Sequence, residues 1–514
     1  MEIIRNNIHM DTQRSAACIQ FTPGEDMNVP DSRPDVSTIL LSDGEVVLSG
    51  IRPGSEQVTV EGDLLVRILY HSEENGGCFV PLEVKIPFKE TLHMNAVTSS
   101  DCVTVETCLE DLSVEIINSR KLSLHSLVTI TAEVEDLYDV ELPVDVSGEE
   151  KPEYRYVPVD VCQMVVSKND IFRLKEEVSL PGTYPNIEKL LWSEVSLEEL
   201  DIRPMEEKLM LSGAVHLFAL YESAGEKNNI TAYETSVPVT GTMDCHGCKE
   251  GMTPDIACTI GQKSIMVRPD EDGEERCINM DLVLELSVRI YEDQQVEMIT
   301  DLYGVENEVC TEYTEQPLRK LFKKVTGKTK VSDKLPVKEG PMLQLLYSHG
   351  EVLRESQTIG PEGIVLKGFL KVKALYITGD DGKPYGFLEE LIPYSYTLEV
   401  QGIRETDVCS VRARVEQLQT IPMGGEELEV KAVLTFSTIL FRTQPLQILS
   451  AAAVSKETAG RNELPGMVIY VVKEGDSLWT IGRKYYVHVE RIKELNHLET
   501  DQLIAGQKLL IVRD

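Results

Sequence analysis

Two short motifs contain residue types that support metal, redox or phosphate chemistry in other proteins. Cys245-His-Gly-Cys248 has the spacing of a metal-ligand or redox pair, but no second CxxC or HxxxH partner accompanies it. Loop thiols without a ligand role are the simpler interpretation. Gly327-Lys-Thr329 matches the end of a phosphate-binding loop, yet Phe322 stands where that loop needs its first glycine. We therefore expect no phosphate site.

Acid–base and nucleophilic catalysis are not indicated either. Acidic pairs such as Asp270-Glu271 and Asp380-Asp381 lie in turn-like contexts, where nothing pairs an acid with a base. The nine histidines include no HExxH motif, and the chain has no GxSxG nucleophile elbow. We predict no catalytic residue, no metal ligand and no cofactor, and we do not expect an enzyme.

The most distinctive pattern of the chain lies at 467–514. β-branched runs open and close this segment, and two stretches of helical periodicity lie between them. The first helix is predicted to begin at Leu478, with Asp476 or Ser477 as its N-cap. The segment is therefore predicted to fold as a compact βααβ unit.

This pattern resembles the LysM domain, a small module that binds glycans containing N-acetylglucosamine, such as peptidoglycan and chitin. The resemblance implies a sugar groove between two loops. Its walls would be Gly475, Asp476, Ser477, Leu478 and Trp479 on one side and Asn496, Leu498 and Ile504 on the other. Tyr486 and His488 depart from the family pattern, which usually has a small residue and a Thr or Ser cap there. Two alternatives stay open: the groove serves a protein, or these residues only build the fold.

A threefold repeat occupies most of the remaining chain. The copies run from Gly62 to Tyr70, from Gly213 to Tyr221 and from Gly368 to Tyr376, and a proline follows each tyrosine after seventeen residues. The glycines recur after 151 and 155 residues, which is the length of a domain. Apolar and polar residues alternate in each copy, which is typical of half-buried strands. The repeated Gly and Tyr are interpreted as structural.

The sequence therefore predicts a mainly β fold with three antiparallel β-sandwich-like repeat domains in series, followed by the small βααβ domain. The expected divisions are an extended lead-in at 1–33, repeat domains at 34–146, 156–308 and 315–450, a linker at 451–466 and the LysM-like module at 467–514.

One connector between the repeats is strongly basic. Leu318, Leu321, Phe322 and Val325 follow the i, i+3, i+4, i+7 pattern, which predicts an amphipathic helix within 318–330. Two interpretations stay open. The helix packs on the third domain with its lysines in solvent, or it docks on an acidic partner or an anionic membrane surface.

Three repeats followed by a LysM-like module resemble the SipL-like spore coat morphogenetic proteins of clostridia and their relatives, whose repeated unit is the SPOCS domain. The resemblance implies a protein made in the mother-cell cytosol during sporulation that assembles at the forespore surface. It also implies docking on the ATPase of the coat's basement layer, with the LysM region in that contact.

The charge and the amino-acid composition limit the classes of partner and the cell compartments that we expect. The formal net charge is −36, and nucleic acid is an unlikely ligand for so acidic a chain because phosphate binding needs a basic surface. The first ten residues lack the apolar core of a signal peptide, and no stretch has the length of a transmembrane segment. Eleven scattered cysteines fit reduced thiols in the cytosol.

Two functional hypotheses follow. The first is a non-enzymatic spore coat or envelope assembly protein that docks on a coat scaffold ATPase through its LysM region and repeats. The second is a peptidoglycan-binding protein whose repeats act as a spacer. Self-association of the repeats stays open in both.

Overall fold

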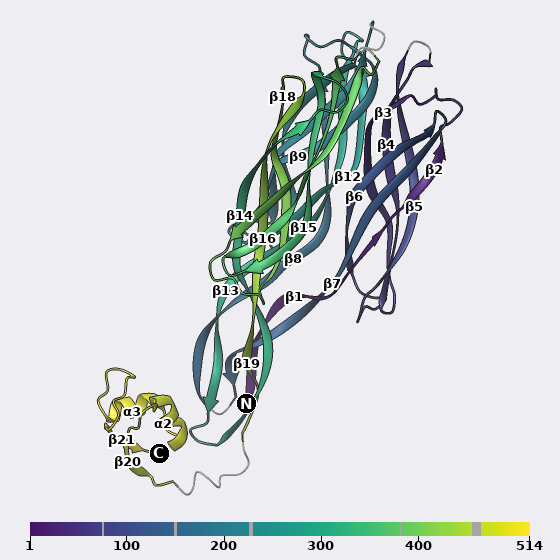
Figure 1. Ribbon diagram of the computed structural model, residues 1–514. Coiled ribbons are helices and arrows are strands. Elements are labelled where there is room, and N and C mark those ends of the chain that lie inside the picture. Colours follow the sequence, from purple (N-terminus) through teal and green to yellow (C-terminus); the bar gives the residue numbers. More distant parts are fainter. Residues whose placement is uncertain (75–76, 149–151, 226–229, 381, 455–463, 514) are drawn as a thin grey trace.

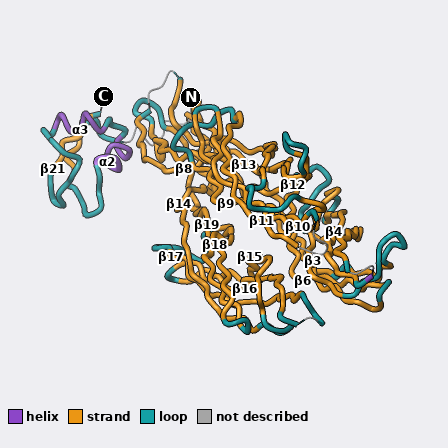
Figure 2. The backbone as a smooth tube through the Cα atoms, turned by 90° about the horizontal axis from the view of Figure 1, so that it is seen from above, coloured by secondary structure: helices purple, strands orange, loops and turns teal. Residues whose placement is uncertain are grey.

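The computed structural model describes the chain except for residues 75–76, 149–151, 226–229, 381, 455–463 and 514. Antiparallel strands form the body in Figure 1, and Figure 2 shows the helices gathered in the C-terminal module. The mainly β fold predicted from the sequence is confirmed.

Each repeat folds as a sandwich of two antiparallel sheets. The first pairs the sheet β3–β4–β5 with a sheet of β1, β2, β6 and β7. Its strands are β1 (Glu2–Phe21), β2 (Gly24–Asn28), β3 (Thr38–Pro53), β4 (Gln57–Ser72), β5 (Cys78–His93), β6 (Val103–Asn118) and β7 (Lys121–Ser147). Residues 2–21 and 24–28, which lie within the predicted lead-in 1–33, form β1 and β2 of this sandwich.

The second and third sandwiches repeat this plan. In the second, β9–β10–β11 faces β8–β13–β12, and in the third, β15–β16–β17 faces β14–β19–β18. The second contains β8 (Glu153–Ser179), β9 (Ile187–Met205), β10 (Lys208–Ser223), β11 (Ile230–Asp244), β12 (Thr253–Pro269) and β13 (Glu275–Tyr303). The third contains β14 (Val309–Pro336), β15 (Met342–Gly360), β16 (Gly363–Thr378), β17 (Tyr385–Glu399), β18 (Val408–Met423) and β19 (Glu427–Val454).

The repeated glycine and tyrosine have structural roles in the central strands. Tyr70 in β4 is fully buried, and its hydroxyl donates to the carbonyl of Pro34 at 2.9 Å. A Cβ atom at Gly62 would lie 2.5 Å from the carbonyl oxygen of Val47, next to a register shift in β3. A bulged neighbouring strand therefore leaves no room for a side chain at this position.

The three sandwiches share an apolar core, which we call the hub. Leu69, Leu220 and Leu375 hold equivalent repeat positions in the three central strands, and each is 0% exposed. Other buried members of the hub are Leu40, Leu41, Phe79, Leu191, Trp192, Phe218, Ile230, Leu346 and Tyr347. Adjacent strand residues point to opposite faces, so each Leu-Tyr pair places its leucine in the hub and its tyrosine in its own sandwich. Domains that follow one another in sequence therefore lie together in space.

Charged side chains border the hub at the same repeat positions. Asp43, Glu194 and His349 are spaced by the repeat length. Asp43 pairs with Arg67 at 2.8 Å, and Glu194 pairs with His349 at 2.5 Å. Burial disfavours the imidazolium, but the hydrogen bond and the negative charge of Glu194 outweigh it and raise the pKa of His349 above its usual value.

The stability of the body is expected to decrease as the pH rises through the raised pKa of His349. A group whose pKa is raised on folding contributes stability that is fully present below its unfolded pKa, about 6.5 for histidine, and lost above its folded pKa. The His349→Gln variant should therefore show a flatter dependence of the thermal midpoint on pH from about 6 to 8.5. Parallel curves for the two proteins would contradict this.

Beyond the sandwiches, the long strands continue as three two-stranded ribbons that form a stalk (Figure 1). The ribbons pair 2–12 with 136–147, 153–163 with 292–303, and 309–319 with 443–454. Their shared core includes Ile8, Met10, Val140, Leu142, Val161, Val296, Met298, Leu318 and Ile448. Each repeat thus contributes one ribbon to the stalk.

The amphipathic helix predicted within 318–330 is wrong. These residues lie in β14, which pairs with β19 along its length. A register shift between Leu321 and Lys323 moves the side-chain alternation by one residue, so the apolar residues of this strand imitate helical spacing. Lysines of this strand also have acidic partners, since Lys328 pairs with Glu416. The lysines therefore lie along a paired strand of the third sandwich.

The C-terminal module has the predicted βααβ order. It comprises β20 (Met467–Val471), α2 (Leu478–Tyr485), α3 (Val489–Leu495) and β21 (Lys508–Val512), with β20 and β21 antiparallel. Its core contains Val472, Leu478, Ile481, Tyr485, Val487, Ile492, Leu509 and Ile511. In Figure 1 the module lies beside the tip of the stalk.

Candidate functional site

The first predicted groove wall begins at the turn before α2. Gly475 is exposed and has a φ of +88°, which favours glycine. The carboxylate of Asp476 accepts hydrogen bonds from the Lys473 amide at 2.7 Å and the Tyr470 hydroxyl at 2.8 Å. These two bonds lower the pKa of Asp476, with the bond from the Lys473 amide contributing most. Asp476 therefore fixes the turn.

The next two residues of this wall start the helix. The Ser477 hydroxyl accepts a hydrogen bond from the Thr480 amide at 3.1 Å, and the Thr480 hydroxyl accepts one from the Ser477 amide at 2.9 Å. This capping box confirms Ser477 as the N-cap. Leu478 is 2% exposed and packs in the core of the module. Both residues build the fold, and whether they also contact a ligand stays a prediction.

The three residues of the second predicted wall differ in their surroundings. The Asn496 amide nitrogen donates to the carbonyls of Ile492 and Leu510, each at 2.8 Å, and its oxygen accepts from the Leu510 amide at 2.6 Å. Leu498 is half-buried against the module core, whereas Ile504 is 75% exposed. Ile504 is the predicted groove residue with the most surface available to a ligand.

Backbone bonds hold the two predicted walls together. The Val472 amide donates to the carbonyl of Gln507 at 2.9 Å, and the Gly506 amide donates to the carbonyl of Val472 at 2.8 Å. The turn after β20 and the turn before β21 therefore lie side by side. The two loops that the family resemblance assigns to the groove are therefore neighbours, and ligand binding between them stays a prediction.

The Asn496→Ala variant is expected to destabilise the module itself. It removes two hydrogen bonds that join the C-terminal end of α3 to Leu510 in β21 and one to Ile492 within α3, at a net cost of about 1 kcal/mol each. Chemical denaturation followed by backbone amide exchange in β21 checks this, with exposed Glu494→Ala as the control on the same helix. If Asn496→Ala leaves exchange in β21 unchanged, its side chain is not a structural link.

Trp479 contacts the stalk. Its indole nitrogen donates to Asp301 at 2.9 Å, and its ring meets the ring of Tyr303 edge-on with centroids 4.9 Å apart. Arg483, one helical turn later, pairs with the same Asp301 at 2.7 Å. Asp301 and Tyr303 end strand β13 at the tip of the second ribbon. One side of the predicted first wall therefore rests on the repeat body.

Tyr303 is central to this contact. It is 3% exposed, and its hydroxyl donates to the carbonyl of Val487 at 2.8 Å. A Cβ atom at Gly482 would lie 2.5 Å from that hydroxyl, so the ring packs closely against α2. Burial and the neighbouring carboxylates of Glu153 and Asp301 raise the pKa of Tyr303, which keeps the phenol protonated as a donor.

The two departures from the LysM pattern now have structural consequences. Tyr486 has a φ of 56° at the C-cap of α2, a left-handed conformation that favours the small residue usual there. His488 gives α3 no side-chain cap. Instead, Glu153 from the start of β8 accepts the Val489 amide at 3.1 Å and lies 3.4 Å from His488. The stalk thus supplies the cap that the module lacks.

Asp301, Tyr303, Glu153 and Arg483 were not predicted as site residues. Their contacts join positions more than 170 residues apart, and no local spacing signals such a pairing. The missing cap at His488 was the available hint, because an uncapped helix start leaves amide groups that need an acceptor.

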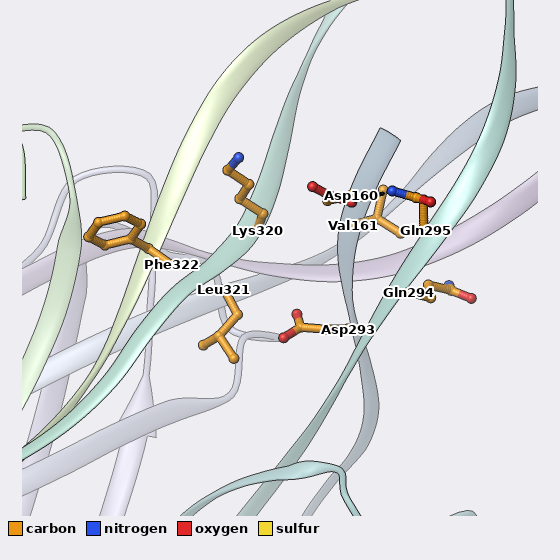
Figure 3. Close-up of a pocket in the computed structure, with 8 residues that line it drawn as sticks. All are labelled: Asp160, Val161, Asp293, Gln294, Gln295, Lys320, Leu321 and Phe322. Atoms are coloured by element: carbon orange, nitrogen blue, oxygen red, sulfur yellow. Dashed lines mark hydrogen bonds between the residues drawn. The ribbon is translucent and has the colours of Figure 1, made fainter. Parts of the chain in front are cut away.

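A second candidate is a cavity of about 410 Å³ between the second ribbon and the part of β14 that follows the third ribbon (Figure 3). Asp160, Val161, Asp293, Gln294, Gln295, Lys320, Leu321 and Phe322 line it. The Gln295 amide donates to Asp160 at 3.1 Å, and burial together with Asp160 raises the pKa of Asp293. The cavity offers polar contacts, but among the described residues that line it no nucleophile is paired with a base.

Two further searches concern metals and membranes. Within the described ranges, no group of three or more His, Cys, Asp and Glu side chains is arranged to hold a metal ion. Among the helices that the structure describes, none has both the length and the apolar character of a membrane span.

Comparisons with known families agree with these domains. A LysM domain model matches residues 470–512, and the model described as SipL, SPOCS domain matches 35–117, 186–268 and 341–421. The chain is 36% identical over 64 residues to a probable endopeptidase p60 of Listeria grayi, covering 12% of each protein. It is 37% identical over 43 residues to the uncharacterized protein YkzQ of Bacillus subtilis strain 168, covering 8% of this chain and 57% of that one. No solved structure matches.

The chain thus spans well under two thirds of these curated relatives. The family matches cover three repeats and the C-terminal module, in the order that the sequence resemblance gave. These domains are sporulation-related and non-catalytic, and the LysM domain is of a peptidoglycan-binding type.

Proposed function

Because the chain has the SipL-like architecture of three SPOCS domains followed by a LysM domain, we propose that it is a non-enzymatic assembly protein of the spore coat or envelope. It acts in the mother-cell cytosol at the forespore surface. There it docks on the coat scaffold ATPase through its LysM region and its repeat domains.

The placement of the LysM module at the stalk tip carries this proposal. Three sandwiches joined at one hub make a single body, and the stalk extends from it to the module. Such a shape suits a protein that holds one binding module at a distance from another contact surface. The formal charge of −36 also favours a basic surface on a protein partner.

Peptidoglycan binding is the alternative, with the repeats as a spacer. The LysM family match favours it, and so does the side-by-side arrangement of the two predicted groove walls. Ile504 then contacts sugar from the second wall, where it is 75% exposed. The two functions differ in what this groove touches.

Parallel binding assays on the full chain separate them. The wild type and Ile504→Asp are tested against purified basement-layer ATPase and against insoluble peptidoglycan, with and without N-acetylglucosamine oligomers. Ile504 has no packing role, so its substitution should leave the fold intact. The matched variant is Ile469→Asp, because Ile469 has a similar exposure of 69% and lies on the outer face of β20.

ATPase binding that the sugar oligomers do not reduce supports the assembly function. Sugar-sensitive pelleting that Ile504→Asp abolishes and Ile469→Asp retains supports the glycan alternative. ATPase binding lost in Ile469→Asp and kept in Ile504→Asp would place the contact on the sheet face. Retention of neither ligand by the folded wild type would overturn both functions.

A further inference from the structure

The turn between β11 and β12 brings two cysteines together inside the second sandwich. The sulfur atoms of Cys245 and Cys248 lie 3.0 Å apart, and both residues are 0% exposed. The Cys248 amide donates to the Cys245 carbonyl at 3.1 Å, and Gly247 between them has a φ of +84°. The turn is therefore closed by its own backbone and points both thiols into the core.

The same turn occurs in the other two repeats, without cysteines. The equivalent positions hold Met94 and Val97 in the first repeat and Val400 and Ile403 in the third. All four are buried apolar residues.

The backbone bonds of the turn repeat as well. Cys245 and Cys248 exchange backbone bonds with Glu207 at 2.9 Å, as Met94 and Val97 do with Glu56 at 3.0 Å. The turn thus forms without sulfur, and a facing pair of thiols is a feature of the second repeat.

The geometry favours a bond between the sulfurs over a shared metal ion. Two thiolates on one zinc ion lie roughly 3.8 Å apart, given Zn–S bonds of about 2.3 Å and tetrahedral angles. The sulfurs here are closer than that, and within the described residues no third ligand completes a metal group. His246 points outward and binds Glu207 at 3.0 Å. A disulfide needs the sulfurs to approach by only about 1 Å.

We propose that Cys245 and Cys248 are an oxidation site that forms an intra-turn disulfide with hydroperoxides, a role independent of the proposed function. One thiolate attacks an oxygen of hydrogen peroxide and becomes a sulfenic acid, and the hydroxide that leaves takes up the proton that this thiol lost and becomes the first water. The sulfur of the other thiol then attacks the sulfenic sulfur, the S–O bond breaks, and the leaving hydroxide takes up the proton of that thiol as the second water. The two thiols lose two electrons and hydrogen peroxide gains them.

Burial sets the conditions for this reaction. Burial and the neighbouring Cys245 raise the pKa of the Cys248 thiol to about 12, so it is protonated at neutral pH. Thiolate is the reactive form, so disulfide formation should be faster at alkaline than at neutral pH. A small hydroperoxide also needs less opening of the turn than a bulky disulfide oxidant.

The test uses the folded full-length chain. Exposed cysteines (Cys18, Cys102, Cys108 and Cys310) are first blocked with iodoacetamide, and the protein is then treated with hydrogen peroxide. After denaturation and a second, distinguishable alkylation, trypsin releases 228–249, which holds Cys245, Cys248 and no other cysteine. The expected product is this peptide unalkylated and lighter by about 2 Da, and dithiothreitol should restore both thiols.

Two variants make the outcome specific. Cys245→Val with Cys248→Ile installs the pair of the third repeat, so it should fold like the wild type and show no mass loss. Cys248→Ile alone leaves Cys245 without a partner, so its peptide should take up dimedone as a sulfenic acid adduct. The peroxide dose is first set on an unblocked sample, as the dose that oxidises its exposed cysteines. If the wild-type peptide still carries two alkyl groups from the second alkylation after this dose, the proposal is wrong.

Discussion

The Leu220→Ala variant is expected to lower the free energy of unfolding by about 2–5 kcal/mol, the range for truncating a leucine in a packed core. Leu220 is 0% exposed and belongs to the hub, which gathers buried side chains from all three repeats. The cavity therefore weakens contacts between domains as well as within one. We expect a urea transition that is single in the wild type to split in this variant.

Met210→Ala is the matched control, because Met210 lies on the same strand β10 and is 44% exposed. Its cost should stay within about 0.5 kcal/mol. Leu217→Ala adds a second comparison, since Leu217 is equally buried but packs inside the second sandwich. Equal, unsplit transitions for Leu217→Ala and Leu220→Ala would show that the hub does not couple the domains.

The repeat plan could be predicted from sequence because its signals are local. Alternation of apolar and polar residues over Gly368–Tyr376 marks a strand half-buried in one sheet. Pro87, Pro238 and Pro393 recur at one position of each repeat and lie in β5, β11 and β17, which are edge strands, where a residue without an amide donor is tolerated. The capping pattern at Ser477 likewise located the start of α2.

The hub was not predicted, although the sequence shows its residues to be apolar. Leu69 and Tyr70 are both buried. A strand with apolar residues on both faces is predicted to be buried on both sides, but its sequence does not identify the residues that cover each face. The partners of Leu69 are 151 and 306 residues away, at Leu220 and Leu375. The helix predicted at 318–330 failed for a related reason, because a bulge in a long strand shifts the alternation and no local feature marks the bulge.

The candidate site was predicted in part. The LysM pattern located Trp479, Asn496 and Ile504, but it did not separate structural residues from exposed ones. Asn496 joins α3 to β21, whereas Ile504 faces solvent. That distinction depends on hydrogen bonds across the module, which spacing alone does not encode. The contact of Trp479 with Asp301 depends on the tertiary fold of the whole chain.

The Tyr303→Ala variant is expected to release the LysM module from the stalk. It removes the hydroxyl bond to Val487 and the ring contact with Trp479, and a buried aromatic anchor of this kind contributes about 2–4 kcal/mol. The bonds that remain, from Trp479 and Arg483 to Asp301 and from the Val489 amide to Glu153, involve partly exposed carboxylates and are individually weak. The docked state should therefore lose most of its population.

Hydrogen–deuterium exchange of the full chain measures the release. The Val489 amide, which donates to Glu153 in the docked state, should exchange faster in Tyr303→Ala, while amides in β20 and β21 keep their protection. Tyr156→Ala is the control, because Tyr156 lies on the same ribbon and is 38% exposed. Unchanged exchange at Val489 would mean that Tyr303 does not hold the module.

Release also bears on ligand binding, because Trp479 belongs to the predicted first wall. If a ligand contacts that wall, docking on Tyr303 competes with it, and the ligand must supply the free energy of undocking. Tyr303→Ala should then bind the ATPase or peptidoglycan more tightly than the wild type, by up to roughly 10-fold for each 1.4 kcal/mol of docking energy removed. Equal affinities alongside faster exchange at Val489 would place the ligand on the opposite wall, with Ile504 as its contact.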